Sequence, residues 1–148
     1  MPPRLPKPDR SHKASAQIRR IVLDTGRSGP PGYAAPVPDQ AARAAFADDV
    51  RRLADRLRGL SEARLDGPLP PHASRAAAAR ALAQLLADAA QDLEEPGAPR
   101  RTVPDLGVFA VGDQVAVTGA DLLAAAGSTD RDVPAEVVES VADLRRRL

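Results

Sequence analysis

The sequence predicts a mainly α-helical protein: a helical hairpin or small helical bundle preceded by a disordered, Pro-rich N-terminal tail. Three observations predict this fold class. Two long segments within residues 39–94 carry apolar side chains at helical spacing. Alanine, the strongest helix former, supplies 30 of the 148 residues. Four prolines within residues 1–10 prevent the N-terminus from forming a packed element.

Residues 1–38 form the predicted basic, Pro/Gly-rich tail and linker. Within them, residues 11–25 are compatible with one short helix, because their apolar side chains fall on one stripe, or with a strand instead. Residues 26–38 contain three Gly and four Pro, which predicts a linker. We therefore expect a single small, mainly helical domain at residues 39–148.

An apolar seam marks the first helix of this domain. Asp39 is its candidate N-cap, because a carboxylate there accepts hydrogen bonds from the free amides of the first turn. Five apolar residues follow at spacings of 4, 3, 4 and 3, which is the a/d pattern of packed helices. These candidate protein-interaction residues are Phe46, Val50, Leu53, Leu57 and Leu60. The seam either packs on the next helix within one monomer or binds a partner helix.

Two further helices are predicted downstream. Residues 74–93 carry an Ala-rich apolar stripe that begins near His72 or Ser74 and ends before Pro96. The last helix begins at Asp132-Val133-Pro134 and ends in three arginines that complement the helix dipole. Its stripe consists of Val133, Val137, Val141, Leu144 and Leu148.

Residues 108–117 are ambiguous. A Gly-Asp pair between two Val-containing runs is typical of the two-residue turn of a β-hairpin. The same stretch could continue as a helix from Asp105 that turns Leu106, Phe109, Ala110 and Val117 inward. Because three glycines in and beside it each oppose a helix by about 1 kcal/mol, a short β-hairpin is the favoured interpretation.

The composition excludes several classes of site. The chain has no Cys, which excludes disulfides, thiol nucleophiles and zinc sites built on Cys. Because it has only two His, we expect no metal site and no cofactor. No apolar run reaches the roughly 18 residues of a membrane span, and the N-terminus lacks the apolar segment of a secretory signal. We therefore expect a cytoplasmic protein without a membrane span.

One short motif bears on enzyme chemistry. The stretch Ile21–Gly26 reads Ile-Val-Leu-Asp-Thr-Gly and resembles the catalytic signature of aspartic proteases of the retroviral type. The resemblance implies that Asp24 would be the catalytic acid and that a second copy would supply the other carboxylate. That family surrounds the motif with an all-β chain, whereas Ala-rich helical patterns follow here. We therefore expect Asp24 and Thr25 to end a short helix or strand before a Gly turn.

The basic N-terminal residues suggest nucleic-acid binding as an alternative function. The net charge is only +1, but residues 1–40 carry seven Lys or Arg against three Asp, whereas residues 41–148 carry 14 Arg against 17 acids. Basic side chains on a tail neutralise phosphates in a sequence-independent and salt-dependent manner. The candidate nucleic-acid residues are Arg4, Lys7, Arg10, Lys13, Arg19, Arg20 and Arg27.

No residue pattern predicts a catalytic centre. Neither His12 nor His72 has a Ser or acidic residue at a nucleophile spacing. The expected function is therefore non-enzymatic: an interaction or regulatory protein that acts through an amphipathic helical surface, as an oligomer or with a protein partner. Leu, Ile, Val and Phe make up only 32 of 148 residues. A domain with so few large apolar groups gains more from a partner surface.

Overall fold

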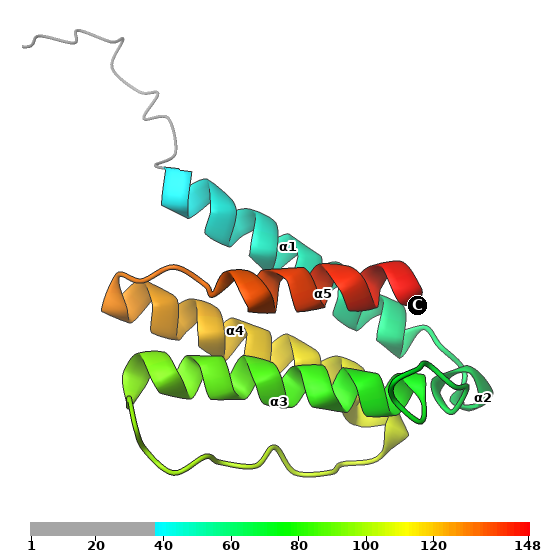
Figure 1. The fold of residues 1–148 in the computed structure, drawn as a ribbon. Helices are drawn as coiled ribbons and strands as arrows, with labels where there is room; N and C mark the ends of the chain where they lie inside the picture. Colours follow the sequence, from blue (N-terminus) through cyan, green and yellow to red (C-terminus); the bar gives the residue numbers. More distant parts are fainter. Residues whose placement is uncertain (1–37) are drawn as a thin grey trace, which may run out of the picture. The chain divides into compact units, whose positions relative to one another are not determined.

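The computed structural model describes residues 38–148, so the predictions for residues 1–37, including the short helix or strand within residues 11–25, lie outside the described part. Residues 38–148 form a bundle of helices without a strand, which confirms the mainly α-helical fold class. The elements are α1 (Pro38–Arg58), α2 (Glu62–Leu65), α3 (Arg75–Glu94), the short 3-10 helix η2 (Val108–Ala110), α4 (Val111–Thr129) and α5 (Ala135–Arg147) (Figure 1).

α4 is the central helix of the bundle. It packs against both α1 and α3, and α5 also packs against α1 and α3 (Figure 1). The main neighbour of α1 is therefore α4 and not α3, although the sequence pattern suggested a direct pairing of the first two long helices. Residues 38–148 adopt a bundle of four long helices, α1, α3, α4 and α5, rather than a lone helical hairpin.

The ends of the helices follow the capping signals of the sequence. Ser74 is the N-cap of α3, and its hydroxyl oxygen accepts a hydrogen bond from the Ala77 amide at 3.1 Å. Pro96 and Gly97 follow the C-terminal end of α3, and Gly97 has a φ of 83°, which favours glycine. α5 begins after Pro134 and ends in the three arginines. The predicted boundaries of α3 are confirmed. α5 begins slightly later than predicted, at Ala135, and Asp39 lies within the first turn of α1 and is not its N-cap.

Small and medium-sized apolar side chains build the core. Leu53 of α1, Leu86 of α3 and Leu122 of α4 are fully buried, and α5 adds Val141. Phe46 is the one aromatic residue in the core of the described region. Alanine fills much of the remaining interior, which lets helices approach closely but buries less apolar area per residue than leucine.

The favoured β-hairpin at residues 108–117 is wrong, because this stretch forms η2 and the first part of α4. The glycines that oppose a helix locally are required by packing against α1. A Cβ atom at Gly119 would lie 2.5 Å from Cγ1 of Val50, and one at Gly112 would lie 2.9 Å from the carbonyl oxygen of Ala54. The close helix contact therefore outweighs the intrinsic cost of about 1 kcal/mol per glycine.

The helical alternative for this stretch was right about the helix and wrong about its inward face. Leu106 and Phe109 are each 65% exposed and Val117 is 60% exposed. The buried face carries Val111 and Val115 instead. Since only the glycine face fits against α1, this contact sets the rotation of α4 and turns Val117 outward.

Gly119 and Gly127 form a matched pair for testing the contact between α1 and α4. We expect Gly119→Ala to lower the free energy of unfolding by about 1–3 kcal/mol, because the new methyl group collides with Val50. Gly127→Ala meets no atom within 4 Å and is expected to raise it by about 0.5–1 kcal/mol through helix propensity. Urea unfolding followed by circular dichroism measures both changes. Equal effects at the two sites would contradict the close contact.

Candidate protein-interaction surfaces

The predicted interaction seam lies inside the bundle. Phe46, Val50, Leu53 and Leu57 are between 0% and 4% exposed, and Leu60 is half-buried against the same core. The intramolecular interpretation of the seam accounts for this placement. A partner would reach these residues only if the bundle opened, so their role in protein interaction stays a prediction.

A buried glutamine holds the long loop between α3 and η2 (residues 95–107) against the bundle. Gln91 of α3 is 6% exposed. Its side-chain amide donates to the carbonyl oxygen of Pro99 at 2.7 Å, and its oxygen accepts from the amide of Arg101 at 3.2 Å. These bonds satisfy backbone groups that a loop without secondary structure leaves unpaired.

Two further glutamines continue this arrangement. The side-chain oxygen of Gln84, two turns earlier on α3, accepts from the amide of Val103 at 2.8 Å. Gln114 of α4 donates to the carbonyl oxygen of Pro104 at 2.5 Å. The loop is therefore attached to both α3 and α4, which fixes the position of the apolar residues that it carries.

A groove of about 490 Å³, the loop groove, lies between this loop and α4. Its apolar lining comes from Val103, Pro104, Leu106, Ala110 and Val117. Phe109 on the neighbouring η2 is as exposed as Leu106. Large apolar side chains that gather on a surface mark interaction sites in soluble proteins.

The outer face of α4 continues this apolar surface away from the loop. It consists of Asp113, Ala116, Val117, Ala120, Asp121 and Ala124, all exposed except the half-buried Ala116. By length and composition alone, Val108–Thr129 is the one helical stretch of the described region that could cross a membrane, and 44% of the stretch that qualifies is buried in the bundle. A core helix meets the same criterion, so this is weak support for a span. It does show that the apolar character of α4 extends beyond its buried face.

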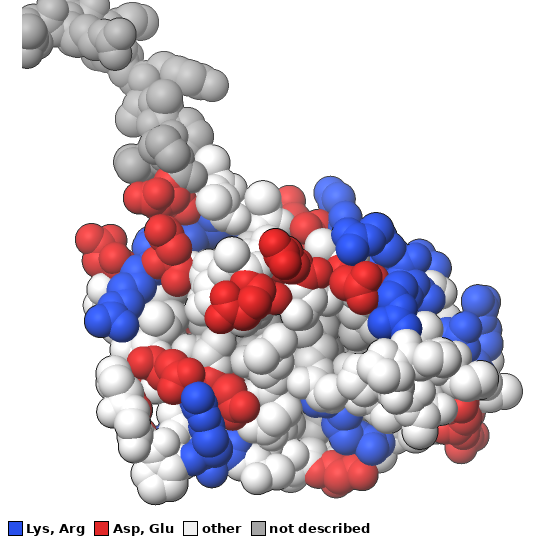
Figure 2. All heavy atoms as spheres, in the orientation of Figure 1, with Lys and Arg blue, Asp and Glu red and all other residues white. Residues whose placement is uncertain are grey.

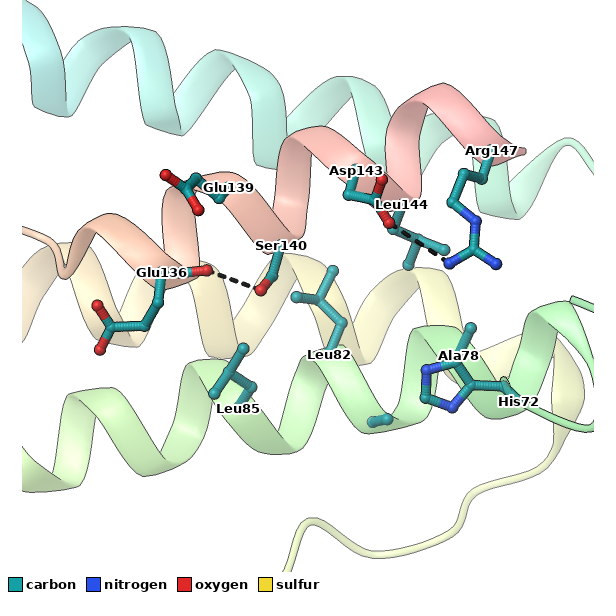
Figure 3. A pocket seen from close by; sticks show the side chains of 11 residues that line it. His72, Ala78, Leu82, Leu85, Glu136, Glu139, Ser140, Asp143, Leu144 and Arg147 are labelled. Atoms are coloured by element: carbon teal, nitrogen blue, oxygen red, sulfur yellow. Dashed lines mark hydrogen bonds and ion pairs between the residues drawn. The ribbon is translucent and has the colours of Figure 1, made fainter. Parts of the chain in front are cut away.

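A second groove, the α3–α5 groove, has a volume of about 500 Å³ and lies between these two helices (Figure 3). Its α3 side is apolar and consists of Ala78, Ala81, Leu82 and Leu85. Its α5 side consists of Glu136, Glu139, Ser140, Asp143, Leu144 and Arg147. His72, just before α3, lines the end near Arg147 (Figure 3).

The charges of the bundle are unevenly placed. Residues 38–148 carry 14 Arg against 18 Asp and Glu, a formal net charge of −4. On the face shown in Figure 2, acidic side chains gather over the first part of α5 beside uncharged surface over the middle of α3, and basic side chains lie over the C-terminal end of α5. The three acidic residues of α5 precede its three C-terminal arginines, so only the first part of this helix offers negative charge to a cationic group.

Exposed ion pairs join the helices. Nε of Arg58 donates to Oδ1 of Asp113 at 2.7 Å and connects the end of α1 to the start of α4. The pKa of Arg58 is raised by this hydrogen bond and further by Asp55, against a smaller opposing effect of desolvation. The pKa of Arg100 is raised chiefly by its hydrogen bond to Asp92. Because arginine is protonated at every physiological pH, neither shift changes a charge.

The remaining predicted site residues lie outside the part of the chain that the structure describes. Within residues 38–148, no group of three or more His, Asp or Glu could hold a metal ion. The candidate nucleic-acid residues, from Arg4 to Arg27, and Asp24 of the protease-like motif lie outside the described residues. Nucleic-acid binding by the tail therefore stays a prediction.

Within residues 38–148, fold and surfaces together define a small bundle of four long helices with open surface grooves. Comparison with protein-family models, curated proteins and solved structures finds no match to the chain. The function is therefore argued from the surfaces themselves.

Neither groove was predicted from the sequence. The spacings of 3 and 4 between Glu136, Glu139 and Asp143 place them on one helix face, and this signal was available. The outward position of Phe109 and Val117 had no such signal, because the rotation of α4 depends on its contact with α1.

Removal of the buried glutamine tests the attachment of the loop. We expect Gln91→Ala to lower the free energy of unfolding by about 1–3 kcal/mol, because the amide of Arg101 and the carbonyl oxygen of Pro99 lose their partner. Trypsin should also cleave faster after Arg100 and Arg101, which mass spectrometry of limited digests measures. Gln40→Ala, at an exposed site on α1, is the control and should change neither property. An unchanged cleavage rate in Gln91→Ala would contradict the role of this side chain.

Proposed function

We propose that this chain is a non-catalytic protein-interaction module in which the outer face of α4 pairs with a second copy of the chain. The exposure of large apolar side chains beside and on that face carries the proposal: 65% for Leu106 and Phe109 and 60% for Val117. The chain contains only two Phe, and one of them lies in solvent. Burial of such groups in an interface is the main favourable contribution to association.

The chemistry of the face favours a second copy as its partner. In a twofold dimer the same patch serves both subunits, so the patch must be complementary to itself. The outer face of α4 carries two charged residues: Asp113, which pairs with Arg58 of α1 at 2.7 Å, and Asp121, at its edge beside the loop groove. An apolar surface with so little charge is complementary to an identical surface without the need for matching opposite charges.

The small residues of α4 allow a close helix contact on this side. Ala116, Ala120 and Ala124 repeat at a spacing of four and form a row along the helix. The neighbouring side of the same helix already uses small residues for close packing, since Gly112 and Gly119 contact α1 and lie one turn from Ala116. A second helix laid along the alanine row would bury Val117 beside it.

Nucleic-acid association remains the alternative from a different class. It rests on the basic residues between Arg4 and Arg27, because residues 38–148 carry a net charge of −4 and so repel a polyanion overall. No feature of the described bundle favours this alternative over protein interaction.

Sedimentation velocity of the full chain across a concentration series tests the self-pairing. We expect a species of twice the 15.5 kDa chain mass, whose dissociation constant rises by about tenfold in Val117→Ser because both subunits lose the apolar contact. Val138→Ser removes the same side chain from α5, where Val138 is 39% exposed, and should leave the dissociation constant unchanged. A chain that stays monomeric at all concentrations, or equal effects of both variants, would overturn the proposal.

A further inference from the structure

The α3–α5 groove combines an apolar floor with an acidic wall. Four floor residues follow one another at spacings of 3, 1 and 3 along α3 and so form one stripe: Ala78, Ala81, Leu82 and Leu85. Ala81 is exposed and Leu85 is half-buried, so α5 leaves part of this stripe uncovered.

A row of carboxylates on α5 forms the wall. Glu136, Glu139 and Asp143 share one helix face, and all three are exposed. Asp143 pairs with Arg146 and Arg147 at 3.3 Å and 3.4 Å. Glu136 and Glu139 form no ion pair within residues 38–148. Two of the three carboxylates are therefore uncompensated by this part of the chain.

The stability of the α5 helix accounts for only one of these two carboxylates. Glu136 lies in the first turn of α5, where its charge stabilises the helix through the dipole. Glu139 lies beyond the first turn, where this effect has fallen off. The Ser140 hydroxyl donates to the backbone carbonyl of Glu136 at 2.7 Å and not to either carboxylate. Glu139 thus has no ion-pair partner within residues 38–148.

We propose that the α3–α5 groove binds a basic amphipathic helix of a partner protein. Apolar residues of that helix cover the α3 stripe, and its Lys or Arg residues pair with Glu136 and Glu139. From Glu136 to Asp143 the wall extends about 10 Å at the helical rise of about 1.5 Å per residue, which matches about two turns of a partner helix. Uncompensated acids beside an apolar floor reject acidic helices, so charge complementarity defines the partner.

This inference goes beyond the self-pairing of α4. The α3–α5 groove shares no lining residue with the outer face of α4. Each surface can therefore fail its own test without affecting the other.

Fluorescence anisotropy with designed peptides tests the proposal on the full chain. The probe is a labelled amphipathic helix of about 14 residues, with Leu at positions i, i+3, i+4 and i+7 and Lys elsewhere. One comparison peptide has Glu in place of Lys, and the other has the composition of the probe in scrambled order. We expect the probe to bind and both comparison peptides to bind at least about tenfold more weakly.

A charge-neutralising double variant and a matched control double variant locate the binding site. Glu136→Gln combined with Glu139→Gln keeps the side-chain shapes and should weaken binding of the probe by about tenfold. Glu62→Gln combined with Asp66→Asn removes the same amount of charge at exposed positions outside the groove. This control pair should leave binding within about twofold of the original chain.

Each other outcome overturns the proposal. Equal weakening by both pairs would show attraction to the net charge alone, and equal binding of the scrambled peptide would show that the apolar floor is not used. Loss of binding in Val117→Ser would place the peptide on the outer face of α4. If sedimentation shows that neutralising Glu136 and Glu139 dissociates a self-associated chain, the occupant of the groove is a second copy and not a basic partner.

Discussion

The bundle depends on the close approach of α1 and α4 at Gly112 and Gly119. At both positions a methyl group would collide with α1, so the two helices lie closer than larger side chains permit. Because only this face of α4 fits, the contact sets the rotation of the helix about its axis. That rotation decides that Val115 enters the core and that Val117 faces outward. The outer face of α4 therefore follows from the same contact that holds the core together.

Hydrogen bonds and ion pairs position the remaining parts to different degrees. The pair between Arg58 and Asp113 is exposed, and exposed pairs of this kind contribute about 0–1 kcal/mol. The hydrogen bonds made by Gln91 are buried. Removal of this side chain would leave two backbone groups unpaired and would therefore lower the stability by more than the loss of an exposed ion pair. The loop groove thus depends on α3 through its glutamines, while the α3–α5 groove depends on the partial cover that α5 gives to the α3 stripe.

Local signals in the sequence were sufficient to predict the helices α1, α3 and α5, because each has an apolar stripe and recognisable ends. They were insufficient for α4, since Gly112 and Gly119 oppose a helix locally and their favourable contacts with Val50 and Ala54 come from a distant segment. The seam of α1 looks the same whether its own chain or a partner covers it. The acids of α5 were visible as a spacing, but the apolar floor beside them belongs to α3, and only the tertiary structure brings the two together.

A double-mutant cycle between Val50 and Gly119 tests the central contact most directly. If the Cβ of Gly119→Ala collides with Val50, the substitution Val50→Ala makes room for it. Unfolding free energies of the two single variants and the double variant then give a favourable coupling of about 1 kcal/mol or more. Effects that add within about 0.5 kcal/mol would contradict the account, because residues in direct steric contact do not behave independently.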